Sequence, residues 1–128
     1  SREVCVLSRS RTNTPLQALA LMNDPQFVEA SRKMAERVIH DCPTGVDERI
    51  KYAFRIVTAR WPEERELRVL RNVYEDEVAR FKGQVDGAKA YVDVGDSPVD
   101  ESIDPCELAA WTTLASTILN LDEAITKS

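Results

Sequence analysis

The chain has 128 residues, a mass of 14.4 kDa and a net charge of −5 at pH 7. This length is enough for one domain with a single core. The negative charge argues against a general surface for nucleic acid or anionic membranes, because both require clustered positive charge. The longest charge-free run, 108–121, is shorter than the roughly 18 apolar residues that a membrane span needs. Few glycines and abundant Ala, Leu, Glu and Arg favour helix.

The N-terminal part predicts an irregular lead-in followed by a short buried helix. Residues 1–13 mix apolar residues with arginines and show no lasting period. Thr14 then provides a capping oxygen before Pro15, which fits the first turn of a helix over 15–22. That helix is apolar on nearly every side, so we expect it to be buried on nearly every side.

Three amphipathic helices are predicted next, over 25–40, 46–59 and 62–82, each with one apolar stripe. Asp24 caps the first of them, and an acidic stretch after Pro62 opens the third at the positive end of the helix dipole. In the first of these helices, five charged residues opposite the apolar stripe are expected to face solvent: Glu29, Arg32, Lys33, Glu36 and Arg37.

The last third of the chain predicts a weak helix, an acidic loop and a second all-apolar helix. The weak helix covers 84–92, and a solvated acidic loop is expected over 93–104, where no basic residue occurs. Asp104-Pro105 starts a helix over 106–119 that has no charged face, and a helix end and turn follow it. The fold expected is all-α: one compact bundle of about five or six helices over 1–128, with the first and last helices central.

Three segments of the chain together resemble a known family. They are Arg11-Thr-Asn-Thr-Pro-Leu-Gln-Ala-Leu with Asn23-Asp-Pro-Gln-Phe27, Arg49-Ile with Ala53-Phe-Arg55 and Arg60, and Glu107-Leu-Ala-Ala-Trp111 with Leu119-Asn-Leu-Asp-Glu123. Their order and spacing resemble the C-terminal part of the planctomycete-specific domain of large cytochrome-c-associated proteins in planctomycetes.

The resemblance implies context more than chemistry. Proteins of this family usually carry a secretion signal and often a haem-binding cytochrome c module, followed by two large domains of unassigned role. The chain would then be an excised C-terminal fragment of a larger extracytoplasmic protein. The family offers no agreed catalytic residues. The haem motif Cys-x-x-Cys-His is absent from this sequence, so no cofactor is expected in this piece.

Polar residues near both ends of the chain form the candidate contact cluster: Arg9, Arg11, Thr12, Asn13, Asp122 and Glu123. The first four precede a buried helix and could bind an anion or a partner beside its positive end, or simply cap backbone groups at a tight corner. The resemblance suggests that Asp122 pairs with Arg11 or Arg55 and joins the two central helices.

Metal sites have weak support in the sequence. The acidic loop lacks the spacing and the central glycine of an EF-hand, so a solvated loop is the better interpretation. His40 with Cys5, Cys42 and Cys106 could complete a zinc site, although their spacing does not favour one. The extracytoplasmic location implied by the resemblance makes a Cys42–Cys106 disulfide the better alternative.

The function expected is that of a non-catalytic structural or interaction module that closes a larger secreted protein. Its partners would be neighbouring domains of that protein, or a second copy docked through an apolar patch. Two alternatives remain open. The chain could complete an enzyme domain, redox or hydrolytic, whose catalytic residues lie upstream and to which Arg9, Arg11 and Asn13 contribute contacts. Its short helices could also mimic a helix-turn-helix DNA binder, which the acidic charge disfavours.

Overall fold

The computed structural model describes the backbone of residues 24–127 and the side chains of residues 24–121. In this part of the chain every regular element is a helix, which confirms the predicted fold class. The helices are α3 (Pro25–Asp41), α4 (Val46–Thr58), α5 (Glu64–Lys82), α6 (Val85–Val92) and α7 (Pro105–Lys127). The apolar helix predicted over 15–22 lies outside the described residues, and so does its expected central place.

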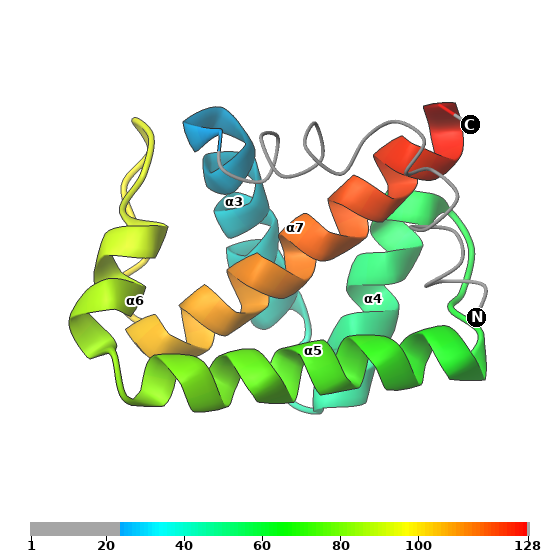
Figure 1. Cartoon of the computed structure of the whole chain (residues 1–128), viewed down its shortest axis with the longest axis horizontal. Helices are drawn as coiled ribbons and strands as arrows, with labels where there is room; N and C mark the ends of the chain where they lie inside the picture. The colour runs from blue at the N-terminus through cyan, green and yellow to red at the C-terminus, as the bar shows by residue number, and fades with distance from the viewer. Residues whose placement is uncertain (1–23, 128) are drawn as a thin grey trace.

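Helix α7 is the centre of the bundle. It crosses the middle of the molecule in Figure 1 and packs against α3, α4, α5 and α6. Four large side chains, Leu108, Trp111, Leu114 and Ile118, are at most 2% exposed. The small residues between them are buried as well, except Thr113 and Thr117, which are partly exposed. The helix is therefore buried on most of its surface over 108–118, as its lack of a charged face predicts. Removing this much apolar surface from water is the main stabilising contribution to the fold.

The end of α7 differs from the prediction. A helix end and turn were expected over 120–125, but the helix continues to Lys127. No glycine or proline follows Leu119, and Leu121 extends the apolar period to a position that is 8% exposed. An asparagine at position 120 alone is too weak a signal to stop a helix whose apolar face continues.

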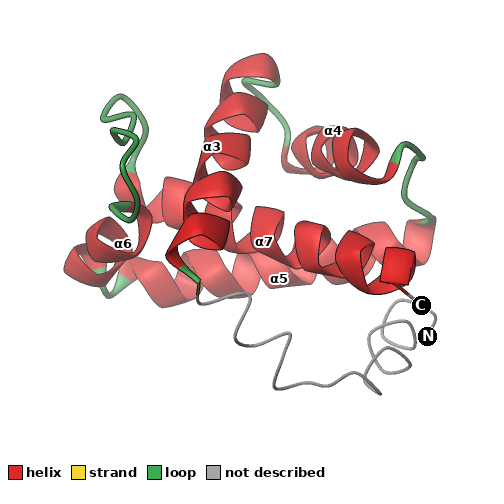
Figure 2. Ribbon diagram, turned by 90° about the horizontal axis from the view of Figure 1, so that it is seen from above, coloured by secondary structure: helices red, strands yellow, loops and turns green. Residues whose placement is uncertain are grey.

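The remaining helices surround α7 on different sides. In Figures 1 and 2, α5 runs lengthwise beside α7, whereas α3 and α4 cross it steeply. The short α6 covers one end of the molecule, where the connection to α7 also lies. Because α5 is covered on one side only, Leu67, Leu70 and Phe81 are its fully buried residues.

The helix starts follow the signals in the sequence. The Asp24 carboxylate accepts a hydrogen bond from the backbone N–H of Gln26 at 2.8 Å, and Asp104 accepts one from Glu107 at 3.0 Å. A capping box joins Glu63 to Glu66 at the start of α5. Glutamate therefore takes the capping position there, where serine or threonine is more common.

Arg49 fastens α4 to the central helix. Its guanidinium donates to the backbone carbonyls of Cys42 at 2.6 Å and Pro43 at 2.8 Å, and to Oε2 of Glu107 at 2.9 Å. It also lies over the ring of Trp111, 5.6 Å from the centroid. One side chain, 8% exposed, thus links the α3–α4 connection to α7. Such a buried network specifies one arrangement of the helices.

Candidate functional site

The predicted polar cluster is not tested by the structure. Arg9, Arg11, Thr12 and Asn13 lie outside the described residues, and Asp122 and Glu123 lie in α7 beyond the last side chain described. Arg55, the suggested partner of Asp122, donates to the carbonyl of Ala59 at 2.7 Å and so closes the end of α4. The cluster stays a prediction.

The described residues contain a different polar site, formed where the acidic loop, residues 93–104, contacts one face of α3. Glu29, Arg32, Glu36 and His40 follow each other at spacings of three, four and four residues, so they share one face of the helix. Each of them contacts the acidic loop. We refer to these four residues as the polar stripe. Three of its members, Glu29, Arg32 and Glu36, are among the charged residues expected to face solvent. That expectation is wrong for Arg32, which is buried, and incomplete for the two glutamates, which are partly buried.

Arg32 is the centre of the polar stripe and is 0% exposed. Its Nη2 donates to the carbonyl of Ser97 at 2.8 Å, and its Nη1 donates to the carbonyl of Pro98 at 3.0 Å and to Oε2 of Glu36 at 3.1 Å. A buried charge is tolerated when it is paired and hydrogen bonded in this way. Its Nε–H has no hydrogen-bond partner. The guanidinium is therefore buried because the loop folds over it.

The two glutamates of the polar stripe hold backbone N–H groups of the loop. Glu29 accepts from Ser97 at 2.7 Å and Glu36 accepts from Asp100 at 2.9 Å. The hydrogen bonds from Ser97 lower the pKa of the Glu29 carboxyl. Gly95, with φ of +92°, lets the loop approach so closely that a Cβ there would lie 2.3 Å from Cδ of Glu29. Only glycine fits this approach without displacement.

Asp100 closes the contact at the far end of the polar stripe. Its Oδ1 accepts from the hydroxyl of Ser102 at 2.6 Å and from the Ser102 backbone at 2.9 Å, while Oδ2 contacts Nε2 of His40. These hydrogen bonds, from Ser102 first and then His40, lower the pKa of Asp100 to about 2. The group is therefore ionised at any physiological pH.

A cleft of about 660 Å³ lies between α6, the acidic loop and the first turns of α7. Its buried part is apolar and consists of Val92, Ile103 and Leu108, the most exposed of which is 8% exposed. Its outer part carries four charged side chains: Lys89, Asp93, Asp100 and Glu101. A concave site with an apolar floor and a few charged groups at its edge is the usual form of a binding site.

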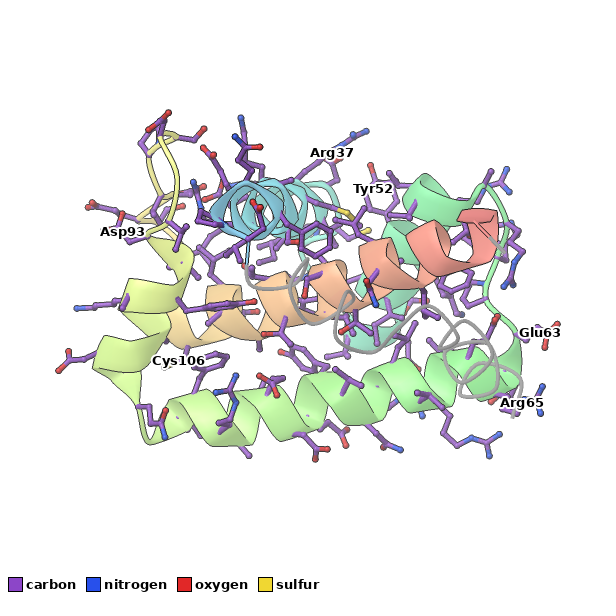
Figure 3. The ribbon with its side chains drawn as sticks, turned by 45° about the horizontal axis from the view of Figure 1, so that its top comes forward. Arg37, Tyr52, Glu63, Arg65, Asp93 and Cys106 are labelled. Atoms are coloured by element: carbon purple, nitrogen blue, oxygen red, sulfur yellow. The ribbon has the colours of Figure 1, made fainter. Side chains whose placement is uncertain are left out.

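A second exposed feature lies on the connection between α4 and α5. Trp61 is 60% exposed, and Ile56 nearby in sequence is 37% exposed. The guanidinium of Arg55 lies 5.3 Å from the Trp61 ring centroid. Figure 3 shows the start of α5, marked by Glu63 and Arg65, at the opposite end of the molecule from Asp93. The Trp61 surface and the cleft are thus well separated.

The cysteine hypotheses are not supported by the arrangement of the described residues. Cys42 and Cys106 are free thiols, so the expected disulfide is wrong for this structure. Arg49 bridges the Cys42 carbonyl and Glu107, whereas the Cys106 thiol contacts the carbonyl of Phe81 on α5 at 3.2 Å. Cys5, the remaining cysteine of the suggested zinc site, lies outside the described residues. Between residues 24 and 121, no group of three or more His, Cys, Asp or Glu side chains could hold a metal ion.

Fold and site together define an all-helical protein in which an acidic loop is folded back on a helix and borders a cleft. The chain belongs to the PSD1 family, described as a protein of unknown function (DUF1553), whose model matches residues 1–74, more than half of the chain. No curated protein and no solved structure matches the chain. The match includes α3 and α4, while the acidic loop and α7 lie outside it. None of the described helices combines the length and the apolar content that crossing a membrane would require.

The polar stripe has a recognisable signal in the sequence. Helix α3 carries two stripes: an apolar one, and a second one of charged and polar residues at positions 29, 32, 36 and 40. A charged stripe at helical spacing is usually solvated, so it does not by itself indicate a contact. The sequence does not reveal the partner of this stripe. The stripe bonds mainly to backbone groups of the loop, and such groups are present in every sequence and leave no side-chain pattern.

Proposed function

We propose that this chain is a non-catalytic helical module that packs against neighbouring domains of a larger extracytoplasmic protein, the role implied by the resemblance to cytochrome-c-associated proteins. The observation that carries the proposal is Trp61, which is 60% exposed on the α4–α5 connection and ordered by Arg55. Tryptophan and arginine are the residues most enriched among those that dominate binding energy in protein interfaces.

The ionisable groups support the same interpretation. Strongly perturbed pKa values gather at catalytic sites, because catalysis needs acids and bases tuned to their task. Here the groups with shifted pKa values serve the fold. The pKa of Asp47 is lowered by its hydrogen bond with Arg71, which joins α4 to α5, and the pKa of Tyr52 is raised by its hydrogen bond to Asp41. Burial raises the pKa of Tyr74, which packs on Trp111.

The test is whether association depends on Trp61. Sedimentation velocity is run on the chain alone and on the chain mixed with the part of its parent protein that precedes residue 1, each as wild type and as Trp61→Ala. We expect concentration-dependent association or binding of the preceding part, weakened at least about tenfold by Trp61→Ala. Circular dichroism of the variant should match wild type. A strictly monomeric chain that does not bind the preceding part contradicts the proposal.

A further inference from the structure

The cleft beside the acidic loop exists before any ligand arrives. Its loop wall, from Pro98 to Ile103, is held by the buried Arg32, by Glu36 and by the contact between His40 and Asp100. A loop fixed in this way does not have to be ordered on binding, which removes part of the entropic cost of association.

The charge of the cleft selects the sign of its occupant. Three carboxylates, Asp93, Asp100 and Glu101, line it against one amine, Lys89. Asp100 is already hydrogen bonded to Ser102 and His40, whereas Asp93 and Glu101 are exposed. These last two carboxylates are therefore available to a cationic group, and the chain as a whole, with a net charge of −5, attracts one.

The apolar floor of the cleft favours a ligand that also carries apolar groups. Val92, Ile103 and Leu108 are buried there, and Val99 packs against the core beside them. A volume of about 660 Å³ is far larger than a metal ion needs and is in the range of sites that hold a few side chains. An apolar floor below acidic edges fits a segment that presents aliphatic and basic side chains in alternation.

We infer that this cleft binds a short basic and apolar polypeptide segment, with lysine or arginine side chains at Asp93 and Glu101 and aliphatic side chains on Val92, Ile103 and Leu108. The inference rests on the proposed function, since it names a partner chemistry for an interaction module. It adds a second contact, at the end of the molecule opposite to Trp61.

The test uses a capped Leu-Lys-Leu-Lys peptide titrated into the isotopically labelled chain and followed by amide chemical shifts. Shifts are expected in residues 89–108. The double variant Asp93→Asn, Glu101→Gln should bind the peptide about five- to tenfold more weakly, and added salt should weaken wild-type binding further. The matched control, Glu63→Gln with Glu64→Gln, removes two charges at the other end of the molecule and should leave binding unchanged.

Other outcomes overturn the inference. A capped Gly-Lys-Gly-Lys peptide that binds equally well would show that the apolar floor has no part. Equal weakening by the control variant would show that only the net charge matters. Shifts of residues 89–108 on concentrating the chain without peptide would assign the cleft to a second copy. If the peptide does not bind but association still depends on Trp61, this inference fails while the proposed function stands.

Discussion

Two connections of this molecule, the α4–α5 connection and the acidic loop, are both ordered, but by opposite means. In the first, Arg60 forms two hydrogen bonds with Glu66, at 2.9 and 2.8 Å, and Glu66 also accepts from the N–H of Glu63 at 2.8 Å. These partners lie at most six residues apart. The acidic loop bonds to α3, whose polar stripe lies 60 to 68 residues away in sequence.

The comparison shows which residues determine the conformation of each connection. The α4–α5 connection needs only its own residues and the first turn of the next helix, so it can form early and locally. The acidic loop carries like charges that repel one another, and it acquires its shape from a helix formed elsewhere in the chain. Long-range contacts of this kind are made only after the loop-closure entropy has been overcome.

Replacing Arg32 should weaken the contact between α3 and the acidic loop more than any other change to the polar stripe. Arg32→Met keeps the apolar stem but leaves the carbonyls of Ser97 and Pro98 without their donor and the carboxylate of Glu36 without its cationic partner. We therefore expect a loss of about 3 kcal/mol in the free energy of unfolding. Urea denaturation measures it. The control is Arg37→Met on the same helix, where the side chain is 62% exposed. Equal losses in both variants would refute the role given to Arg32.

Gly95→Ala should cost somewhat less, about 2 kcal/mol, because a Cβ must share space with Glu29 and the backbone must keep a positive φ. Gly45→Ala is the matched control, since Gly45 has a φ of +90° but its nearest neighbour, Oε1 of Glu48, is 3.2 Å away. The excess cost at position 95 measures the close approach of loop and helix. We expect faster hydrogen exchange of the Ser97 and Asp100 amides in Gly95→Ala only.

Acid should release the loop at its Asp100 end. The pKa of Asp100 is about 2 in the folded protein and near 3.8 without its partners. Its contribution to stability is therefore fully present above about pH 4 and is lost as the pH falls toward 2. Stability curves measured between pH 5 and 2 should be less steep for Asp100→Asn than for wild type. Curves of identical slope would show that Asp100 is not held as described.

Trp61→Ala should have the smallest effect on stability, below about 1 kcal/mol, because an exposed ring contributes little besides its contact with Arg55. Trp111→Ala, by contrast, removes a ring that is 2% exposed and should cost about 3–5 kcal/mol. Thermal unfolding of both variants checks the contrast. A large loss at Trp61 would mean that the connection depends on its ring more than on Arg60 and Glu66.

The same contrast explains which features could be predicted from the sequence. Apolar periodicity located α3 to α7, and the Asp-Pro and Pro-Glu-Glu signals located three helix starts, because each depends on residues a few positions apart. The burial of Arg32 and Arg49 could not be predicted in this way. Both guanidiniums bond to backbone carbonyls, which no side-chain pattern reveals, and both were charged residues on helices that have ample exposed surface.

The cleft was beyond sequence reasoning for a related reason. Its floor could be recognised as apolar, but Val92 and Leu108 come from two different helices and Ile103 from the loop between them. Their convergence depends on how the loop is folded back, and that depends on α3. The candidate residues chosen from the sequence are not tested by the structure: Arg9, Arg11, Thr12 and Asn13 before the first predicted helix, and Asp122 and Glu123 near the end of α7.

The chemistry by which α3 holds the acidic loop has a consequence for variation. Four of the hydrogen bonds end on main-chain atoms of Ser97, Pro98 and Asp100, which any residue able to adopt the same backbone would supply. Gly95, Ser97, Asp100 and Ser102 take part in the contacts through their own conformation or side chains. The other polar side chains of the loop can be exchanged without releasing it from α3. Natural variation or protein engineering could thus substitute many surface residues of the loop while α3, unchanged, preserves the shape of its backbone.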